Sequence, residues 1–116
     1  MVSGESDLLM LRDRLRAFAA ERDWEQFHSP KNLSMALMVE VAELMEHFQW
    51  LTEAQSADLC AEDKQAVSEE LADILLYLVR LSDRLGVDLK VAAERKLEKN
   101  AAKYPAEQVR GSAKKR

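Results

Sequence analysis

Hydrophobic residues recur every three or four positions along most of the chain, which is the spacing of amphipathic helices. Ser29 followed by Pro30 is a helix-start signal, because serine caps a helix and proline suits its first position. We expect that helix to run from there to about Leu51. An earlier helix is predicted from Asp7 to about Arg22 or Asp23, with apolar positions at Leu8, Leu11, Leu15 and Phe18.

The second half of the chain continues this pattern. Thr52 and Gln55 have the spacing of a capping box, which predicts a short helix or turn. A long helix is expected from near Glu62 to Leu85, with Gly86 as the residue that ends it. Asp88 is a suitable N-cap for a last helix, which should end before Pro105.

The predicted fold is therefore all-α, a four-helix bundle type of domain spanning residues 7–105. Residues 1–6 are expected to be a flexible N-terminus, and residues 106–116 a flexible basic tail. Both long central helices also carry apolar residues away from their core stripes. A lone four-helix domain offers little to cover these residues, so we expect homo-oligomerisation through the central helices. The apolar residues away from the core stripes are Val39, Ala42, Leu76 and Val79.

Two pairs of acidic residues interrupt the apolar runs of the central helices. Glu40 and Glu43 lie three residues apart on one helix, and Glu70 and Asp73 repeat that spacing on the other. At helical periodicity each pair lies at the edge of the surface that must be buried. Burying unpaired carboxylates is costly and clustered acids repel one another, so the pattern favours a bound cation. Oxygen-only ligation suits Mg²⁺, or Mn²⁺.

Paired acids also occur in proteins that bind no magnesium or manganese. Acids at a helix edge are commonly surface charge or ion pairs, and a single pair would be assigned to that class. A di-iron bundle also uses paired carboxylates, but it requires Glu-x-x-His on two helices. Here His47 follows Glu43 by four residues, and no histidine follows the second pair. Two pairs without that motif therefore favour the oxygen-only metal site.

Composition narrows the partners and the compartment. The 116 residues carry a formal net charge of −4, which argues against a nucleic-acid polymer bound over the whole surface. Cys60 is the single cysteine, so an intramolecular disulfide is excluded and a cytoplasmic setting is expected. No apolar run approaches the ~18 residues of a membrane span, so no membrane association is predicted.

Several polar and aromatic residues are candidates for substrate contact. Trp50 falls on the acid stripe, where it would stack a planar base, although tryptophans such as Trp24 and Trp50 more often serve packing. Taken alone, His28 and His47 are more simply explained as structural or surface histidines. Lys96, Asn100 and Lys103 share one helix face, which is either a solvated basic face or a binding site for a polyanion. Asn32, near a helix start, could contact phosphate.

Three segments together resemble the MazG-like nucleotide pyrophosphohydrolases, especially their small dCTP pyrophosphatase branch. They are E-V-A-E-L-M-E-H-F-Q-W from Glu40, E-E-L-A-D-I-L-L-Y-L-V from Glu69 and K-L-E-K-N-A-A-K-Y-P from Lys96. The resemblance extends from about Leu8 to Pro105. It implies an all-α NTP pyrophosphatase fold, assembled as a homodimer or homotetramer. It also implies Mg²⁺-dependent cleavage of a nucleoside triphosphate, dCTP or a modified dCTP, to monophosphate and pyrophosphate, which would clear unwanted nucleotides.

The resemblance assigns roles residue by residue. It implies metal binding by Glu40, Glu43, Glu70 and Asp73, with Glu43 our choice for the group that orients the attacking water. The implied nucleotide-pocket residues are Trp24, Trp50, Tyr77, Lys96, Asn100 and Tyr104, and His28 and Asn32 match the adjoining motif. Lys103, on the same helix face as Lys96, is added as a substrate-binding residue that would steady the leaving pyrophosphate. Two alternatives stay open: a hydrolase of the same fold acting on dUTP or on a broad range of nucleotides, and a non-catalytic helical dimer that binds a nucleotide or a protein.

Overall fold

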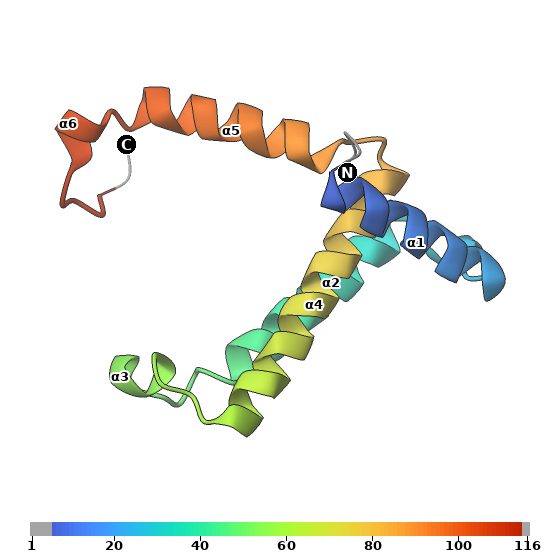
Figure 1. Cartoon of the computed structure of the whole chain (residues 1–116), viewed down its shortest axis with the longest axis horizontal. Coiled ribbons are helices and arrows are strands. Elements are labelled where there is room, and N and C mark those ends of the chain that lie inside the picture. The colour runs from blue at the N-terminus through green and yellow to red at the C-terminus, as the bar shows by residue number, and fades with distance from the viewer. Residues whose placement is uncertain (1–5, 115–116) are drawn as a thin grey trace, which may run out of the picture.

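The computed structural model describes residues 6–114, and every regular element within that range is helical (Figure 1). This confirms the all-α prediction. The elements in chain order are α1 (Asp7–Glu21), the 3-10 turn η1 (Glu25–Phe27), α2 (Pro30–Glu46), α3 (Glu53–Ser56), α4 (Ala61–Arg84), α5 (Leu89–Lys103) and α6 (Ala106–Val109).

Side-chain caps fix where the helices begin. The Ser29 hydroxyl accepts a hydrogen bond of 3.1 Å from the backbone N–H of Asn32, and Pro30 occupies the first turn of α2. Asp88 caps α5 in the same way by accepting from the backbone N–H of Val91 at 3.1 Å. Thr52 forms the predicted capping box with Gln55 at the start of α3. These starts agree with the sequence analysis because capping is a local interaction.

Helix α2 ends at Glu46, several residues before the predicted end near Leu51. The backbone N–H of His47 bonds to the carbonyl of Leu44 at 3.2 Å, and that of Phe48 bonds to the carbonyl of Met45 at 2.9 Å. These three-residue bonds wind the chain more tightly than an α-helix does, so the segment continues as turns.

Helix α4 ends at Arg84 and is followed by Gly86, whose φ of 70° lies in the left-handed region. Glycine adopts that conformation without strain. The backbone N–H of Val87 then bonds to the carbonyl of Ser82 at 2.8 Å, which closes the turn. The chain leaves this turn in a new direction, and α5 starts immediately afterwards.

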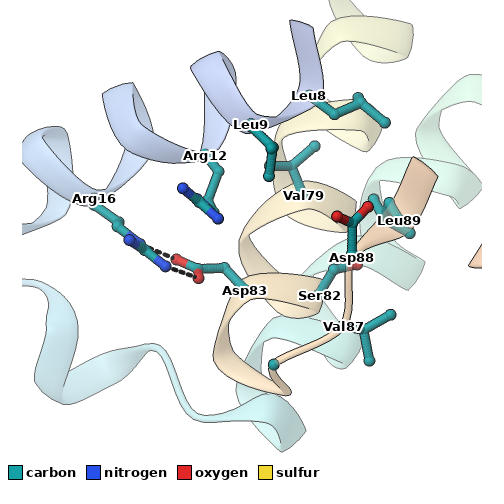
Figure 2. A pocket seen from close by; sticks show the side chains of 11 residues that line it. Leu8, Leu9, Arg12, Arg16, Val79, Ser82, Asp83, Val87, Asp88 and Leu89 are labelled. Atoms are coloured by element: carbon teal, nitrogen blue, oxygen red, sulfur yellow. Dashed lines mark hydrogen bonds and ion pairs between the residues drawn. The ribbon is translucent and has the colours of Figure 1, made fainter. Parts of the chain in front are cut away.

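The body of the molecule is the antiparallel pair α2 and α4, with α1 packed across the C-terminal part of α4 (Figure 1). Leu33 on α2 and Ala19 on α1 are almost fully buried, as are Val67 and Val79 on α4. The prediction that Val79 lies away from the core was therefore wrong, because this single chain already buries it. An ion pair between Arg16 and Asp83 also joins α1 to α4 (Figure 2).

Helix α5 extends away from the α2–α4 pair (Figure 1), and the only helix pairs that pack extensively within residues 6–114 are α2 with α4 and α1 with α4. One chain therefore does not close a four-helix bundle by itself. Large apolar side chains are left exposed on α2, α4 and α5, among them Met35, Met38, Val39, Met45, Leu71, Leu75 and Leu97.

The ends of the chain were expected to be flexible. Residues 1–5 and 115–116 lie outside the described residues, so the prediction of a flexible N-terminus falls almost entirely outside them. The segment expected to be a flexible basic tail contains one helical turn, α6, directly after Pro105. Within residues 6–114, none of the helices combines the length and the apolar character needed to cross a bilayer.

Candidate metal and nucleotide site

Three carboxylates from the two central helices meet at one place. Glu40 and Glu43 come from α2 and Glu70 from α4, and one oxygen of each lies within 4.8 Å of the others. Because α2 and α4 run side by side, an acid pair on one helix faces an acid on the other. All three residues are half-buried.

Within residues 6–114, no ion pair joins these carboxylates to a basic side chain. Glu40 Oε2 and Glu70 Oε2 are buried and have no hydrogen-bond partner among the described residues. Burial, the contacts with Glu43 and Glu70 and the charges of Glu43 and Asp73 raise the pKa of Glu40 to about 7. Unpartnered buried carboxylate oxygens are the donor set that a hard divalent cation requires, so Mg²⁺ or Mn²⁺ fits these residues.

Asp73 stands apart from this group of three. Its side chain is exposed and lines an adjoining cavity, although its charge still contributes to the raised pKa of Glu40. The four acids singled out from the sequence are therefore arranged as a tight group of three with a fourth acid beside it.

The adjoining cavity has a volume of about 230 Å³ and a mainly apolar wall. Phe18 and Trp24 meet edge to face within this wall, with ring centroids 5.8 Å apart. An apolar cavity with a few polar groups, next to a cation site, is suited to a planar ligand that carries negative charge. The lining residues are Leu15, Phe18, Ala19, Trp24, His28, Leu33, Asp73, Leu76, Tyr77 and Arg80.

His28 is held in this cavity by Arg80, whose Nε donates to His28 Nδ1 at 3.1 Å. Burial and the charges of Arg80 and Arg84 lower the pKa of His28. The lowered pKa favours the neutral imidazole, and since Nδ1 accepts from Arg80, the ring proton is expected on Nε2. The sequence analysis did not single out Arg80. The available signal was a charged residue in the apolar run of α4, one turn after Tyr77.

Two predicted substrate-binding residues at the ends of α2, Asn32 and Trp50, lie outside the cavity wall. Asn32 donates from its side chain to the carbonyl of Phe27 at 3.1 Å, so it secures the turn before α2. Trp50 follows α2 and is 86% exposed, with no part in the cavity wall.

The four predicted residues near the C-terminus lie on α5 or at its end. Lys96 and Lys103 are exposed, whereas Asn100 and Tyr104 are half-buried. Lys103 Nζ lies 5.4 Å from the centre of the Tyr104 ring. Because α5 projects from the body, a single chain does not gather these residues around the acids (Figure 1).

The chain is similar in sequence to a known protein family. The model of the MazG-like family matches residues 35–116. The chain belongs to the MazG-like family. This confirms the resemblance recognised in the sequence.

Named relatives of this MazG-like chain agree with that placement. It is 50% identical over 103 residues to dCTP pyrophosphatase 1 of Rattus norvegicus, covering 86% of this chain and 61% of the relative. The identity to dCTP pyrophosphatase 1 of Bos taurus is 46% over 113 residues, covering 96% of this chain and 67% of the relative. The chain thus spans roughly three fifths to two thirds of these curated relatives.

A solved structure shares the fold over nearly its whole length. It is a pyrophosphatase from Archaeoglobus fulgidus, with a TM-score of 0.82 and 39% sequence identity, covering 90% of this chain and 98% of that one. The agreement extends beyond the α2–α4 pair, because that pair alone makes up less than half of the aligned chain.

Proposed function

We propose that this MazG-like chain is a nucleoside triphosphate pyrophosphohydrolase, which converts a deoxynucleoside triphosphate and water to the monophosphate and pyrophosphate. One observation carries the proposal: the buried carboxylate oxygens of Glu40 and Glu70 lack hydrogen-bond partners within residues 6–114, and Asp73, whose charge acts on Glu40, lines an apolar cavity. The names of the relatives support the same reaction.

In this proposal Glu40, Glu43 and Glu70 would hold a divalent cation, Mg²⁺ or Mn²⁺, and Asp73 would add a further negative charge nearby. The bound cation would offset the negative charge of the phosphates and of the acids. Glu43 orients a water molecule toward the α-phosphorus and accepts its proton. A new P–O bond forms at the α-phosphorus while its bond to the α–β bridging oxygen breaks, and pyrophosphate leaves.

The base occupies the cavity in this proposal. Trp24 and Tyr77 supply aromatic surface on which a pyrimidine ring stacks, and stacking of this kind tolerates any base. We propose dCTP or a 5-modified dCTP as the substrate, consistent with the names of the relatives. Clearance of such nucleotides from the cytoplasmic pool would be the biological use.

We also propose that a second copy of the chain completes the site, in a dimer or a tetramer. Helix α5 carries Lys96, Asn100, Lys103 and Tyr104, and it extends from the body with Leu97 68% exposed. An isolated helix of this length is marginally stable in water. Docking α5 on the exposed apolar residues of a partner would stabilise it and bring its cations toward the phosphates.

The test is to incubate the purified chain with Mg²⁺ and each natural and 5-modified deoxynucleoside triphosphate, and to identify the products. Monophosphate plus pyrophosphate is expected, with turnover lost in Glu40→Gln. Glu46→Gln is the matched control, because Glu46 is an exposed acid on the same helix. Orthophosphate plus diphosphate would contradict the proposed cleavage position, and absence of turnover with any nucleotide would favour a binding module.

A further inference from the structure

Arg80 lines the cavity, and one of its nitrogens has no partner among the described residues. Its side chain is 5% exposed, and Nη2 is buried without a hydrogen-bond partner among residues 6–114. A buried guanidinium is costly unless its donors are satisfied, and natural proteins leave few such groups unpaired. An unsatisfied donor on the wall of a cavity is explained when a ligand supplies the acceptor.

The other nitrogens of Arg80 are occupied, and they fix its position. Nε donates to His28 Nδ1 at 3.1 Å, and Nη1 lies 3.5 Å from Asp83 Oδ2. Asp83 is itself held by two hydrogen bonds from Arg16 of α1. The guanidinium is therefore anchored on two sides, which leaves Nη2 as its free donor group.

The contact with Arg80 also determines what His28 offers to a ligand. A histidine nitrogen that accepts a hydrogen bond carries no proton, so the proton of the neutral ring is on Nε2. Arginine has donors only. The Arg80–His28 pair thus has free donors and no free acceptor, and it would suit a ligand with neighbouring acceptors.

Pyrimidine bases differ in this respect. Cytosine has two adjacent acceptors, O2 and N3, on its pairing edge, whereas thymine and uracil carry a hydrogen on N3. A pair of donors complements cytosine, but it would face the N3–H of thymine or uracil with another donor. Unpaired donors in a binding site discriminate strongly against the wrong base.

We propose that Arg80 and His28 together read the base, and that their donors select cytosine over thymine and uracil. The inference deepens the proposed function, since it assumes that the cavity takes the base of the nucleotide. It does not require hydrolysis, so it is testable separately from the reaction.

The test measures binding of the monophosphates dCMP, dUMP and dTMP by calorimetry, alongside turnover of the triphosphates. Wild-type protein should bind dCMP most tightly. Arg80→Met should weaken dCMP binding about 10- to 100-fold, the range expected for lost hydrogen bonds to a charged donor. Binding of dTMP should change by less than about threefold, because thymine makes no matched pair of bonds with these donors. The preference for cytosine would then largely disappear.

Arg84→Met is the matched control. Arg84 is exposed on the same helix, and its charge also lowers the pKa of His28, but none of the observed hydrogen bonds joins the two residues. The preference for dCMP should survive this substitution. A loss of preference in both variants would attribute the effect to charge and overturn the specific role of Arg80.

Folding of Arg80→Met is checked by circular dichroism, and Arg80→Lys serves if that variant does not fold. Lysine keeps the charge but not the fork of donors, so the preference should fall here as well. Nitrogen-15 NMR of wild-type His28 should show the Nε2–H tautomer. An Nδ1–H tautomer, or an undiminished cytosine preference in the folded variant, would overturn the inference. Cytosine-selective binding without hydrolysis would preserve it and reject the proposed reaction.

Discussion

Arg16 on α1 donates two hydrogen bonds to Asp83 on α4, from Nε to Oδ2 at 2.8 Å and from Nη2 to Oδ1 at 2.6 Å. The two residues lie 67 positions apart in the sequence. Asp83 is largely shielded, with a side chain 10% exposed, and it also lies 3.5 Å from Arg80. This pair forms part of the wall of a second cavity of about 240 Å³ (Figure 2), and it connects the α1–α4 contact to the guanidinium beside His28.

Asp83→Asn should destabilise the fold by about 1–3 kcal/mol at pH 7, because Arg16 and buried Arg80 both lose their charged partner. The hydrogen bond from Arg16 and the charges of Arg16, Arg80 and Arg12 lower the pKa of Asp83 below its ordinary 3.8. Its contribution is present above that unfolded-state value and is lost as pH falls through the lower folded value. Urea denaturation at pH 7 and pH 3 should show a smaller difference at pH 3.

Asp13→Asn is the control for this experiment. Asp13 also pairs with arginines, but its side chain is 49% exposed. Exposed pairs of this kind contribute between 0 and about 1 kcal/mol. Equal losses in the two variants would mean that Asp83 is no more than a surface charge.

The acid cluster should make the metal-free protein less stable as pH rises. The folded pKa of Glu40 is about 7, above its ordinary 4.5, so the folded state retains a proton that the unfolded state has released. The free energy of unfolding should therefore decline between pH 4.5 and 7, apart from the other groups. Thermal melts with a chelator test this, and Glu40→Gln should flatten the profile. A profile equally steep in Glu40→Gln would assign the titration to another group.

Glu70→Gln should weaken divalent cation binding while it preserves the fold. Removing one ligand of a hard cation should lower Mn²⁺ affinity at least about tenfold. The metal-free protein should gain about 1 kcal/mol at pH 8, because less charge is confined in the cluster. Titration with Mn²⁺, followed by electron paramagnetic resonance, measures the affinity. Glu46→Gln should bind Mn²⁺ like the wild type, and an unaffected Glu70→Gln would remove Glu70 from the metal site.

A mixture of two inactive variants should recover activity if the partner's α5 completes the site. Glu40→Gln removes a metal ligand from the body, and Lys96→Met removes a cation from α5, so each homo-oligomer lacks one function at every site. A hybrid dimer has one site in which the body and the α5 are both intact. Refolding the variants together should restore up to about a quarter of wild-type turnover by random pairing. No recovery in a verified hybrid would place both groups within one chain.

The parts of the fold that depend on neighbouring residues were predictable from the sequence. Ser29 and Pro30, the Thr52 capping box and Gly86 each act over a few positions, and the helices begin or end at them as expected. The end of α2 was placed too late, because the periodicity of apolar residues continues through turns that use three-residue hydrogen bonds.

The site was only partly predictable for a related reason. Helical spacing placed Glu40 and Glu43 on one face, but the choice of Glu70 over Asp73 as their nearest neighbour depends on how α4 packs. Arg80 was missed because His28, its partner from a distant segment, is brought to it by tertiary structure. The direction of α5 depends on the geometry of the turn before it. The spacing of residues in the sequence does not specify that geometry.

The acid cluster also makes the stability of the folded protein depend on a bound cation. A ligand bound only by the folded state adds stability that grows with its concentration, about 2.7 kcal/mol at a hundred times its dissociation constant. Chains without a cation would unfold more often and be the preferred targets of proteases. If the cluster binds Mg²⁺ as proposed, the concentration of this ion would affect the amount of folded protein. It would also affect the rate at which that protein hydrolyses nucleotides.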